Sequence, residues 1–308
     1  MSFRFLNHSR FDLVRWLSNR FMQLIIYPSI WVAGAIASLG LYIQEILGLE
    51  HNPQAIALIF VTALIPYNLD RIFDSYVQEI PDRQAQLFFR QPYIWILLLG
   101  AIATTIGLLY HAPSRVRYVS IAGIIPLLYG APLFPWKSDS KKRWYRLKDI
   151  PGSKAWIVGS ILTYAVVALP MAYGNAEFDS RVASIGLFMF VFIVTNSHVF
   201  DIRDLESDRQ KEVTTLPIMV GVRGTKLILT IMNLFVVILV VYGWTTNVMV
   251  AHPEMILAIA VNLIYIWLVN IDTPRWVYSI WIEGFLFVPI LGYRVILNFP
   301  FLFDRLLV

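Results

Sequence analysis

Long runs of apolar residues, each about as long as a membrane-spanning helix, alternate along the chain with short polar segments. A helix needs about 20 predominantly apolar residues to cross the hydrocarbon core of a bilayer. Nine segments meet this requirement: 23–47, 53–70, 92–110, 116–134, 155–174, 182–200, 226–246, 253–270 and 276–297. The pattern predicts an all-α membrane protein, in which residues 23–308 form a single bundle of nine transmembrane helices.

The first 22 residues follow a different pattern, because arginines alternate there with large apolar side chains. Arg4, Arg10, Arg15 and Arg20 are interleaved with Phe, Leu and Trp residues. This mixture of basic and bulky apolar residues is typical of a helix that lies in the membrane interface. We therefore expect residues 1–22 to form an amphipathic surface segment that precedes the first span.

The composition supports a membrane protein and excludes several other classes. Hydrophobic residues make up 58% of the 308 residues and charged residues only 15%, whereas soluble domains contain about 45–50% apolar and about 25% charged residues. This balance excludes an ordinary cytosolic enzyme, a disordered protein and a nucleic-acid-binding domain. The chain has no cysteine, which excludes disulfides, thiolate zinc sites and cysteine nucleophiles.

The 25 lysines and arginines are distributed unequally between the two predicted sides of the membrane. If every span crosses once, 20 of them lie on the side of the N-terminus and 5 on the opposite side. The positive-inside rule then places the N-terminus in the cytoplasm and the C-terminus on the opposite side. The long loops after the second, fourth and sixth spans lie on the cytoplasmic side and contain half of the 20 acidic residues, so we expect the active face there.

One group of acidic residues follows the sixth predicted span. Asp201, Asp204 and Asp208 have the spacing i, i+3 and i+7, which places them within about 60° of one another on a helix. Like charges in such a stripe repel one another, and a bound cation would relieve this repulsion. A ligand set made only of oxygens favours Mg²⁺ over Zn²⁺. With Arg203 and Lys211 nearby, the stripe indicates a site for Mg²⁺ and a diphosphate.

A second acidic group ends the second predicted span. Asp70 and Asp74 have the spacing i, i+4 and share a helical face. They lie on the same predicted side of the membrane as the first group. Two acidic faces that open on one side of a bundle could hold two Mg²⁺ ions on a diphosphate. The alternative for each group is a solvated polar loop, in which the acids pair with neighbouring arginines.

These motifs resemble those of the UbiA-type intramembrane prenyltransferases, a family of nine-helix bundles that includes 4-hydroxybenzoate polyprenyltransferases and chlorophyll synthases. The DxxDxxxD pattern of residues 201–208 matches the second aspartate motif of the family in full, and residues 70–74 resemble the DRxxD core of the first. Residues 129–132 and 147–152 resemble the connection between the fourth and fifth spans. The chain departs from the family at Pro66, where an Asn usually precedes the first motif.

The resemblance implies a Mg²⁺-dependent transfer of a prenyl group from a prenyl diphosphate to a membrane-accessible, often aromatic acceptor. It implies that the aspartates of both motifs are catalytic residues and Mg²⁺ ligands: Asp70, Asp74, Asp201, Asp204 and Asp208. The residues that it suggests for substrate binding are Asn68, Arg71, Lys154, Arg203, Lys211, Tyr67 and Tyr129. Membrane lipids would be the other contacts of the bundle, with no role for nucleic acid.

Two alternatives to this function stay open at the level of the sequence. One is a divergent, inactive member of the family, because Pro66 replaces the usual Asn. The other is a cation-coupled secondary transporter in which the acids bind the coupling ions. Transporter sites usually lie near the bilayer midplane, whereas these acids lie at predicted helix ends beside basic residues, which favours the prenyltransferase.

Overall fold

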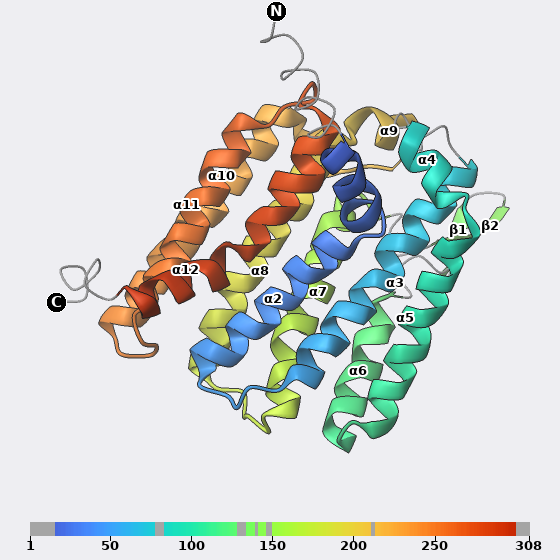
Figure 1. Ribbon diagram of the computed structural model, residues 1–308. Coiled ribbons are helices and arrows are strands. Elements are labelled where there is room, and N and C mark those ends of the chain that lie inside the picture. Colours follow the sequence, from blue (N-terminus) through green and yellow to red (C-terminus); the bar gives the residue numbers. More distant parts are fainter. Residues whose placement is uncertain are drawn as a thin grey trace, which may run out of the picture.

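A computed structural model of the chain describes residues 16–77, 83–127, 134–138, 141–145, 150–210 and 213–299. Helices dominate this part of the chain (Figure 1). In chain order the helices are the π-helical η1 (Met22–Ile26), α2 (Ile30–Leu47), α3 (Pro53–Val77), α4 (Arg83–Phe89), α5 (Pro92–His111), α6 (Ser114–Leu127), α7 (Ser153–Tyr173), α8 (Ser180–Arg203), α9 (Leu205–Gln210), α10 (Leu216–Thr245), α11 (Pro253–Leu268), the π-helical η4 (Val277–Ile282), the 3₁₀-helical η5 (Phe285–Phe287) and α12 (Val288–Asn298).

The predicted helical membrane architecture is confirmed at the level of its class. Within the described residues, seven helical segments are long and apolar enough to span a membrane: Ile30–Leu47, Pro53–Ile72, Pro92–His111, Ser153–Tyr173, Ser180–Arg203, Leu216–Thr245 and Val277–Asn298. The apolar helix α11 has 16 residues, and α6 has 14 up to Leu127, where this described part of the chain ends. The total of nine spans stays a prediction.

The structure also has features that the sequence pattern did not predict. The strands β1 (Phe134–Ser138) and β2 (Lys141–Tyr145) form an antiparallel hairpin within the basic loop that follows α6. The first predicted span, 23–47, is divided into η1 and α2 by the turn around Ser29, whose φ of 60° is left-handed. Residues 16–21 of the predicted surface segment are helical, and residues 1–15 lie outside the described part.

Local sequence explains several helix ends. Asp179 caps α8, because its carboxylate accepts a hydrogen bond from the Val182 N–H at 2.8 Å. Gly48 ends α2 in the left-handed conformation (φ 66°) that glycine adopts without steric cost. The helix α3 continues through Pro66, the residue at which the chain departs from the family pattern.

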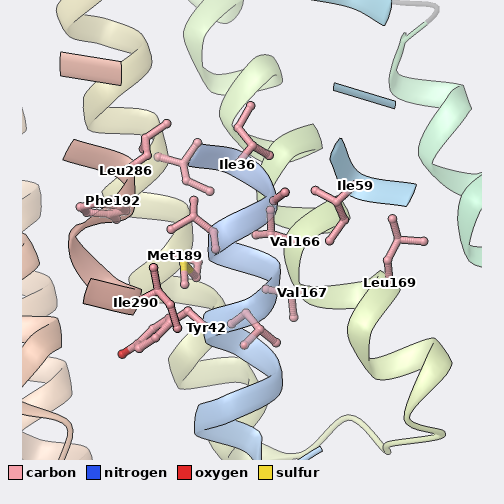
Figure 2. Packing of buried hydrophobic residues seen from close by; sticks show 14 of the residues in the cluster. Ile36, Tyr42, Ile59, Val166, Val167, Leu169, Met189, Phe192, Leu286 and Ile290 are labelled. Atoms are coloured by element: carbon pink, nitrogen blue, oxygen red, sulfur yellow. The ribbon is translucent and has the colours of Figure 1, made fainter. Parts of the chain in front are cut away.

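The core of the bundle joins α2, α3, α7, α8 and the C-terminal helices (Figure 2). The residues packed there include Ile36 of α2, Ile59 of α3, Val166 of α7 and Phe192 of α8. The helices α7 and α8 approach closely at Gly159, where an added Cβ would lie 2.3 Å from Val194 Cγ2. This glycine allows the close packing that brings the first turn of α7 against the C-terminal end of α8.

The two acidic motifs lie at the same end of the bundle (Figure 1). The helix α3 runs toward the end where α4 is found, and α8 runs toward the end where it meets α9. The connection between α2 and α3 lies at the opposite end. This arrangement brings the motifs to one face of the bundle, as their spacing along the chain predicted.

Candidate functional site

The second acidic motif spans the junction between α8 and α9. The helix α8 ends at Arg203 and α9 begins at Leu205. The backbone keeps helical hydrogen bonds through the junction, because the Asp204 N–H donates to Phe200 O at 3.0 Å and the Asp208 N–H donates to Asp204 O at 2.8 Å. The helical spacing of the three aspartates predicted from the sequence is thus retained.

Lys154, in the first turn of α7, joins two aspartates of this motif. Its Nζ lies 3.1 Å from Asp208 Oδ1 and 3.6 Å from Asp201 Oδ1. Both carboxylates are buried, with 3% of each residue exposed. The start of α7 is held nearby, because Gly152 is left-handed (φ 75°) and its N–H donates to Thr214 O at 2.6 Å. An ammonium group therefore already lies between two carboxylates that were predicted to share a metal ion.

The remaining aspartate of the motif has a different partner. Arg203 donates from Nε and Nη2 to the two carboxylate oxygens of Asp204 at 2.8 and 2.7 Å. The guanidinium also lies over the rings of Phe200 and Tyr278, 4.6 and 5.6 Å from their centroids. This bidentate pair with aromatic faces beside it fixes the plane of the guanidinium.

The pKa values of two of these aspartates are shifted in opposite directions. Burial raises the pKa of the Asp208 carboxyl above its ordinary value, and the nearby charge of Lys154 only partly opposes this shift. Burial also acts to raise the pKa of Asp204, but the hydrogen bonds and charge of Arg203 hold that pKa below its ordinary value. Asp204 is therefore firmly ionised at neutral pH, whereas Asp208 is the aspartate whose charge depends more on a neighbouring cation.

Two polar side chains at the first motif contact the backbone of the N-terminal segment. The side chain of Asn68 is buried and donates to Pro28 O at 3.0 Å and to Leu64 O at 2.8 Å. The Arg71 guanidinium donates to Ile26 O at 2.9 Å. Both side chains thus bind backbone at the break between η1 and α2, where carbonyl groups lack regular helical partners.

Of the other predicted site residues, the structure describes Asp70 and Tyr67 in full and Asp74 only as part of a helix. Asp70 is exposed on α3, and Tyr67 is half-buried there against the core. Asp74 belongs to α3, but its side chain lies outside the described part, as do Tyr129 and Lys211 entirely. The predicted approach of the first motif's acids to the second motif's acids therefore stays a prediction.

Three residues near the site were missed from the sequence, and all come from the C-terminal part of the chain. Tyr278 packs against Arg203, Arg275 interacts electrostatically with Asp204, and Glu283 pairs with Arg71 at 3.4 Å. A signal for Glu283 was present in the sequence, since an ionisable residue inside a membrane span indicates function by default. The two others depend on how the last helices pack and left no comparable signal.

His198 lies one turn before Asp201 on α8, with its Nδ1 3.4 Å from Asp201 Oδ2. The imidazole is fully buried and lies edge-on to the Trp156 ring, 4.9 Å between centroids. Neither ring nitrogen has a hydrogen-bond partner with acceptable geometry in the described structure. His198 therefore lies between Asp201 and Trp156 of α7.

The aspartates of the second motif are candidate ligands for Mg²⁺, which prefers oxygen donors. No group of three or more His, Cys, Asp or Glu side chains has metal-binding geometry among the described residues. Asp201 and Asp208 nevertheless fit a hard cation, because their oxygens converge on the ammonium of Lys154. Mg²⁺ usually binds through one or two carboxylates together with water and substrate phosphates. These two aspartates could therefore hold it once Lys154 moves to a phosphate oxygen.

Comparison with solved structures shows a shared fold. A UbiA homologue from Archaeoglobus fulgidus, with GPP and Mg²⁺ bound, has a TM-score of 0.59 at 13% identity, and the match covers 90% of this chain and 99% of that one. A UbiA homologue from Aeropyrum pernix K1 has a TM-score of 0.56 at 14% identity, over 89% and 98% of the two chains. A digeranylgeranylglyceryl phosphate synthase structure has a TM-score of 0.53 at 16% identity, over 90% and 97%.

Comparison of the sequence alone gives a second, independent result. No curated protein sequence matches the chain. The model of the UbiA prenyltransferase family, however, matches residues 68–288, a range that includes both aspartate motifs and Lys154. Since this range is well over half of the chain, the protein belongs to the UbiA prenyltransferase family.

Proposed function

We propose that the protein transfers a prenyl group from a prenyl diphosphate to a membrane-accessible, aromatic acceptor, and that it requires Mg²⁺. The observation that carries this proposal is that Asp201 and Asp208 share the ammonium group of Lys154, at the end of the bundle where the first motif also lies. Family membership supports the reaction class. The relative from Archaeoglobus fulgidus that holds GPP and Mg²⁺ supports the donor and the metal.

The residues of the site have complementary roles in this reaction. Mg²⁺ held by the aspartates would supply positive charge to the departing diphosphate. Arg203 and Lys154 would donate hydrogen bonds to the same leaving group, and their pairing with Asp204 and Asp208 of the second motif supports these roles. Arg71, beside Asp70 of the first motif, would do the same from α3. Preorganised donors of this kind act most strongly when the carbon–oxygen bond breaks and charge develops on the diphosphate.

Burial around the site would protect the reactive allylic cation. Asp201 and His198 are buried, and the aromatic rings of Phe200 and Tyr278 lie beside the second motif. An aromatic face stabilises a cation, and a closed site keeps water from trapping it. The acceptor is proposed to reach the site from the membrane, since apolar side chains cover the outer surface of the bundle.

The experiment that tests this function is a diphosphate-release assay on the purified full-length protein. The protein would be incubated with Mg²⁺ and a panel of prenyl diphosphates, with and without aromatic acceptors. We expect release that depends on Mg²⁺. Asp201→Ala and Asp204→Ala should each lower turnover at least about 100-fold, whereas Asp179→Ala at the opposite end of α8 should not. A wild-type protein that binds no prenyl diphosphate in Mg²⁺ would refute the proposal.

We also propose that the end of the bundle carrying the acidic motifs faces the cytoplasm, because most lysines and arginines lie on that predicted side. The chain has no cysteine, so single cysteines can report the orientation. Gln91→Cys and Glu50→Cys replace exposed residues in the α4–α5 and α2–α3 connections. In oriented spheroplasts a membrane-impermeant maleimide should label the cysteine at 50 and not that at 91. The reverse labelling would invert the proposed orientation.

A further inference from the structure

A buried carboxylate from the last membrane segment lies against the first aspartate motif. Glu283 follows the π-helix η4, and only 4% of the residue is exposed. Its Oε1 lies 3.4 Å from Arg71 Nη2. The charge of Glu283 also interacts with that of Arg203 in the second motif. One carboxylate is therefore coupled to an arginine from each motif.

The position of Glu283 is fixed by side chains from two other helices. A π-turn does not continue the regular ladder of the α-helix, and such turns are frequent at functional sites. Carbonyl groups of η4 accept hydrogen bonds from Trp31 Nε1 of α2, which donates to Ile280 O at 2.9 Å, and from Asn196 Nδ2 of α8, which donates to Ile282 O at 2.8 Å. These two bonds hold the backbone just before Glu283 in place.

The residue after Glu283 is a glycine, Gly284, whose lack of a side chain allows Trp31 to pack close to it. An added Cβ at Gly284 would lie 3.1 Å from Trp31 Cζ2, which is tight for a carbon–carbon contact. The Trp31 ring packs against Phe287, with 5.1 Å between centroids. The segment around Glu283 is thus interlocked with α2 and α8, and the carboxylate has little freedom to move.

The surroundings explain why a carboxylate is retained here. An ionised carboxylate loses most of its hydration in such a place and requires a cationic partner. Arg71 supplies that partner while it donates to Ile26 O at 2.9 Å. Arg203 is held by Asp204 on its other side. Glu283 therefore contacts the Arg71 guanidinium directly, and its charge acts on the Arg203 guanidinium, which Asp204 holds.

We propose that Glu283 is a positioning residue that aligns Arg71 and Arg203 for a shared diphosphate, and so couples the two aspartate motifs. This inference rests on the proposed function. Glu283 itself would not touch the prenyl donor. It would hold the two guanidinium groups at the separation that the leaving diphosphate requires, because a small misplacement of such groups costs about 100-fold in rate.

The test compares Glu283→Gln with the control variant Glu254→Gln. Glu254 is also buried, but it lies at the opposite end of the bundle, where it accepts a hydrogen bond from the Tyr42 hydroxyl at 3.0 Å. Diphosphate release with Mg²⁺ and geranyl diphosphate gives kcat and KM, and thermal unfolding gives stability. For Glu283→Gln we expect kcat to fall about 100-fold with a donor KM within about threefold, because the guanidinium groups bind the developing charge more strongly than the ground state.

Glu254→Gln should lower the unfolding temperature and leave kcat within about twofold. A second variant, Glu283→Asp, keeps the charge and shortens the side chain, and it should recover part of kcat. Equal kcat losses in Glu283→Gln and Glu254→Gln would overturn the positioning role. It would also be overturned if Glu283→Asp and Glu283→Gln both kept the kcat of the wild type. If the wild-type protein releases no diphosphate from any donor, the proposed function fails, and this inference fails with it.

Discussion

Lys154→Met removes the ammonium group that lies between two buried carboxylates of the second motif. In the structure Nζ is 3.1 Å from Asp208 Oδ1 and 3.6 Å from Asp201 Oδ1. Methionine keeps much of the length and the apolar stem of the side chain, so the change removes mainly the charge. Two carboxylates would then face each other without the cation that now separates them.

The magnitude follows from the geometry. Unit charges 3.1 Å apart attract by about 1 kcal/mol in water and by about 5 kcal/mol at an effective dielectric constant of about 20. The Lys154 side chain is 36% exposed, so solvent screens the pair and the lower part of this range applies. We expect a loss of about 2 kcal/mol in the free energy of unfolding. For a chain of this size that corresponds to about 3 °C in the unfolding temperature.

The assay is thermal unfolding of the detergent-solubilised protein across a titration of Mg²⁺. A ligand that binds only the folded state stabilises it by about 2.7 kcal/mol at a concentration 100 times its Kd. The ammonium group and Mg²⁺ compete for the same oxygens, so Lys154→Met should bind Mg²⁺ more tightly than the wild type. The variant should therefore be less stable in EDTA and should regain most of the difference as Mg²⁺ is added.

Lys226→Met provides the matched control. Lys226 of α10 is buried, and its Nζ contacts Asn270 Oδ1 at 2.9 Å and Trp267 O at 3.4 Å rather than a carboxylate. This variant should lose stability equally in EDTA and in Mg²⁺. If the deficit of Lys154→Met is likewise constant at every Mg²⁺ concentration, Lys154 does not occupy a cation site and the reasoning is refuted.

Three further predictions concern the same end of the bundle. The raised pKa of Asp208 contributes stability that is present below its unfolded pKa of about 3.9 and is lost as the pH rises through the folded pKa. Mg²⁺ needs the ionised carboxylate, so it should restore this stability at higher pH. In thermal unfolding, the stabilisation by Mg²⁺ should therefore grow with pH in the wild type and stay constant with pH in Asp208→Asn. Gly159→Ala should cost about 1–3 kcal/mol in denaturant unfolding because its Cβ would meet Val194 Cγ2 at 2.3 Å, and an unchanged midpoint would contradict the close packing of α7 on α8. Asn196→Ala should cost about 1 kcal/mol, because Ile282 O loses its donor; hydrogen exchange should rise in η4 and not in α5.

The sequence was sufficient for features that depend on helical periodicity. The spacing of Asp201 and Asp208 predicted a common face, and in the structure both contact one ammonium group. The long apolar runs predicted membrane helices, and seven helices in the described residues have the required length and composition. These features are local, because they depend only on the rise and rotation per residue of a helix.

Features that depend on packing between distant segments were not predictable in this way. The π-turn before Glu283 is stabilised by donors that lie about 250 and 90 residues away in sequence, Trp31 and Asn196. The turn at Ser29 is likewise held by Asn68 of α3, whose amide donates to Pro28 O. Periodicity places a residue on a face of its own helix, but it does not say which other helix supplies the partner.

The charges at this end of the bundle are arranged as an exchange of partners. Among the described side chains that pair there, the carboxylates of Asp201, Asp204, Asp208 and Glu283 face the cations Lys154, Arg203 and Arg71, and the charge of Arg275 also acts on Asp204. Each of these charges therefore has a partner before any substrate binds. A metal and a diphosphate that arrive together bring both signs, so the carboxylates can take the metal while the basic groups take the phosphate. The ionic groups then never face the low-dielectric interior unpaired, where isolated charges cost most.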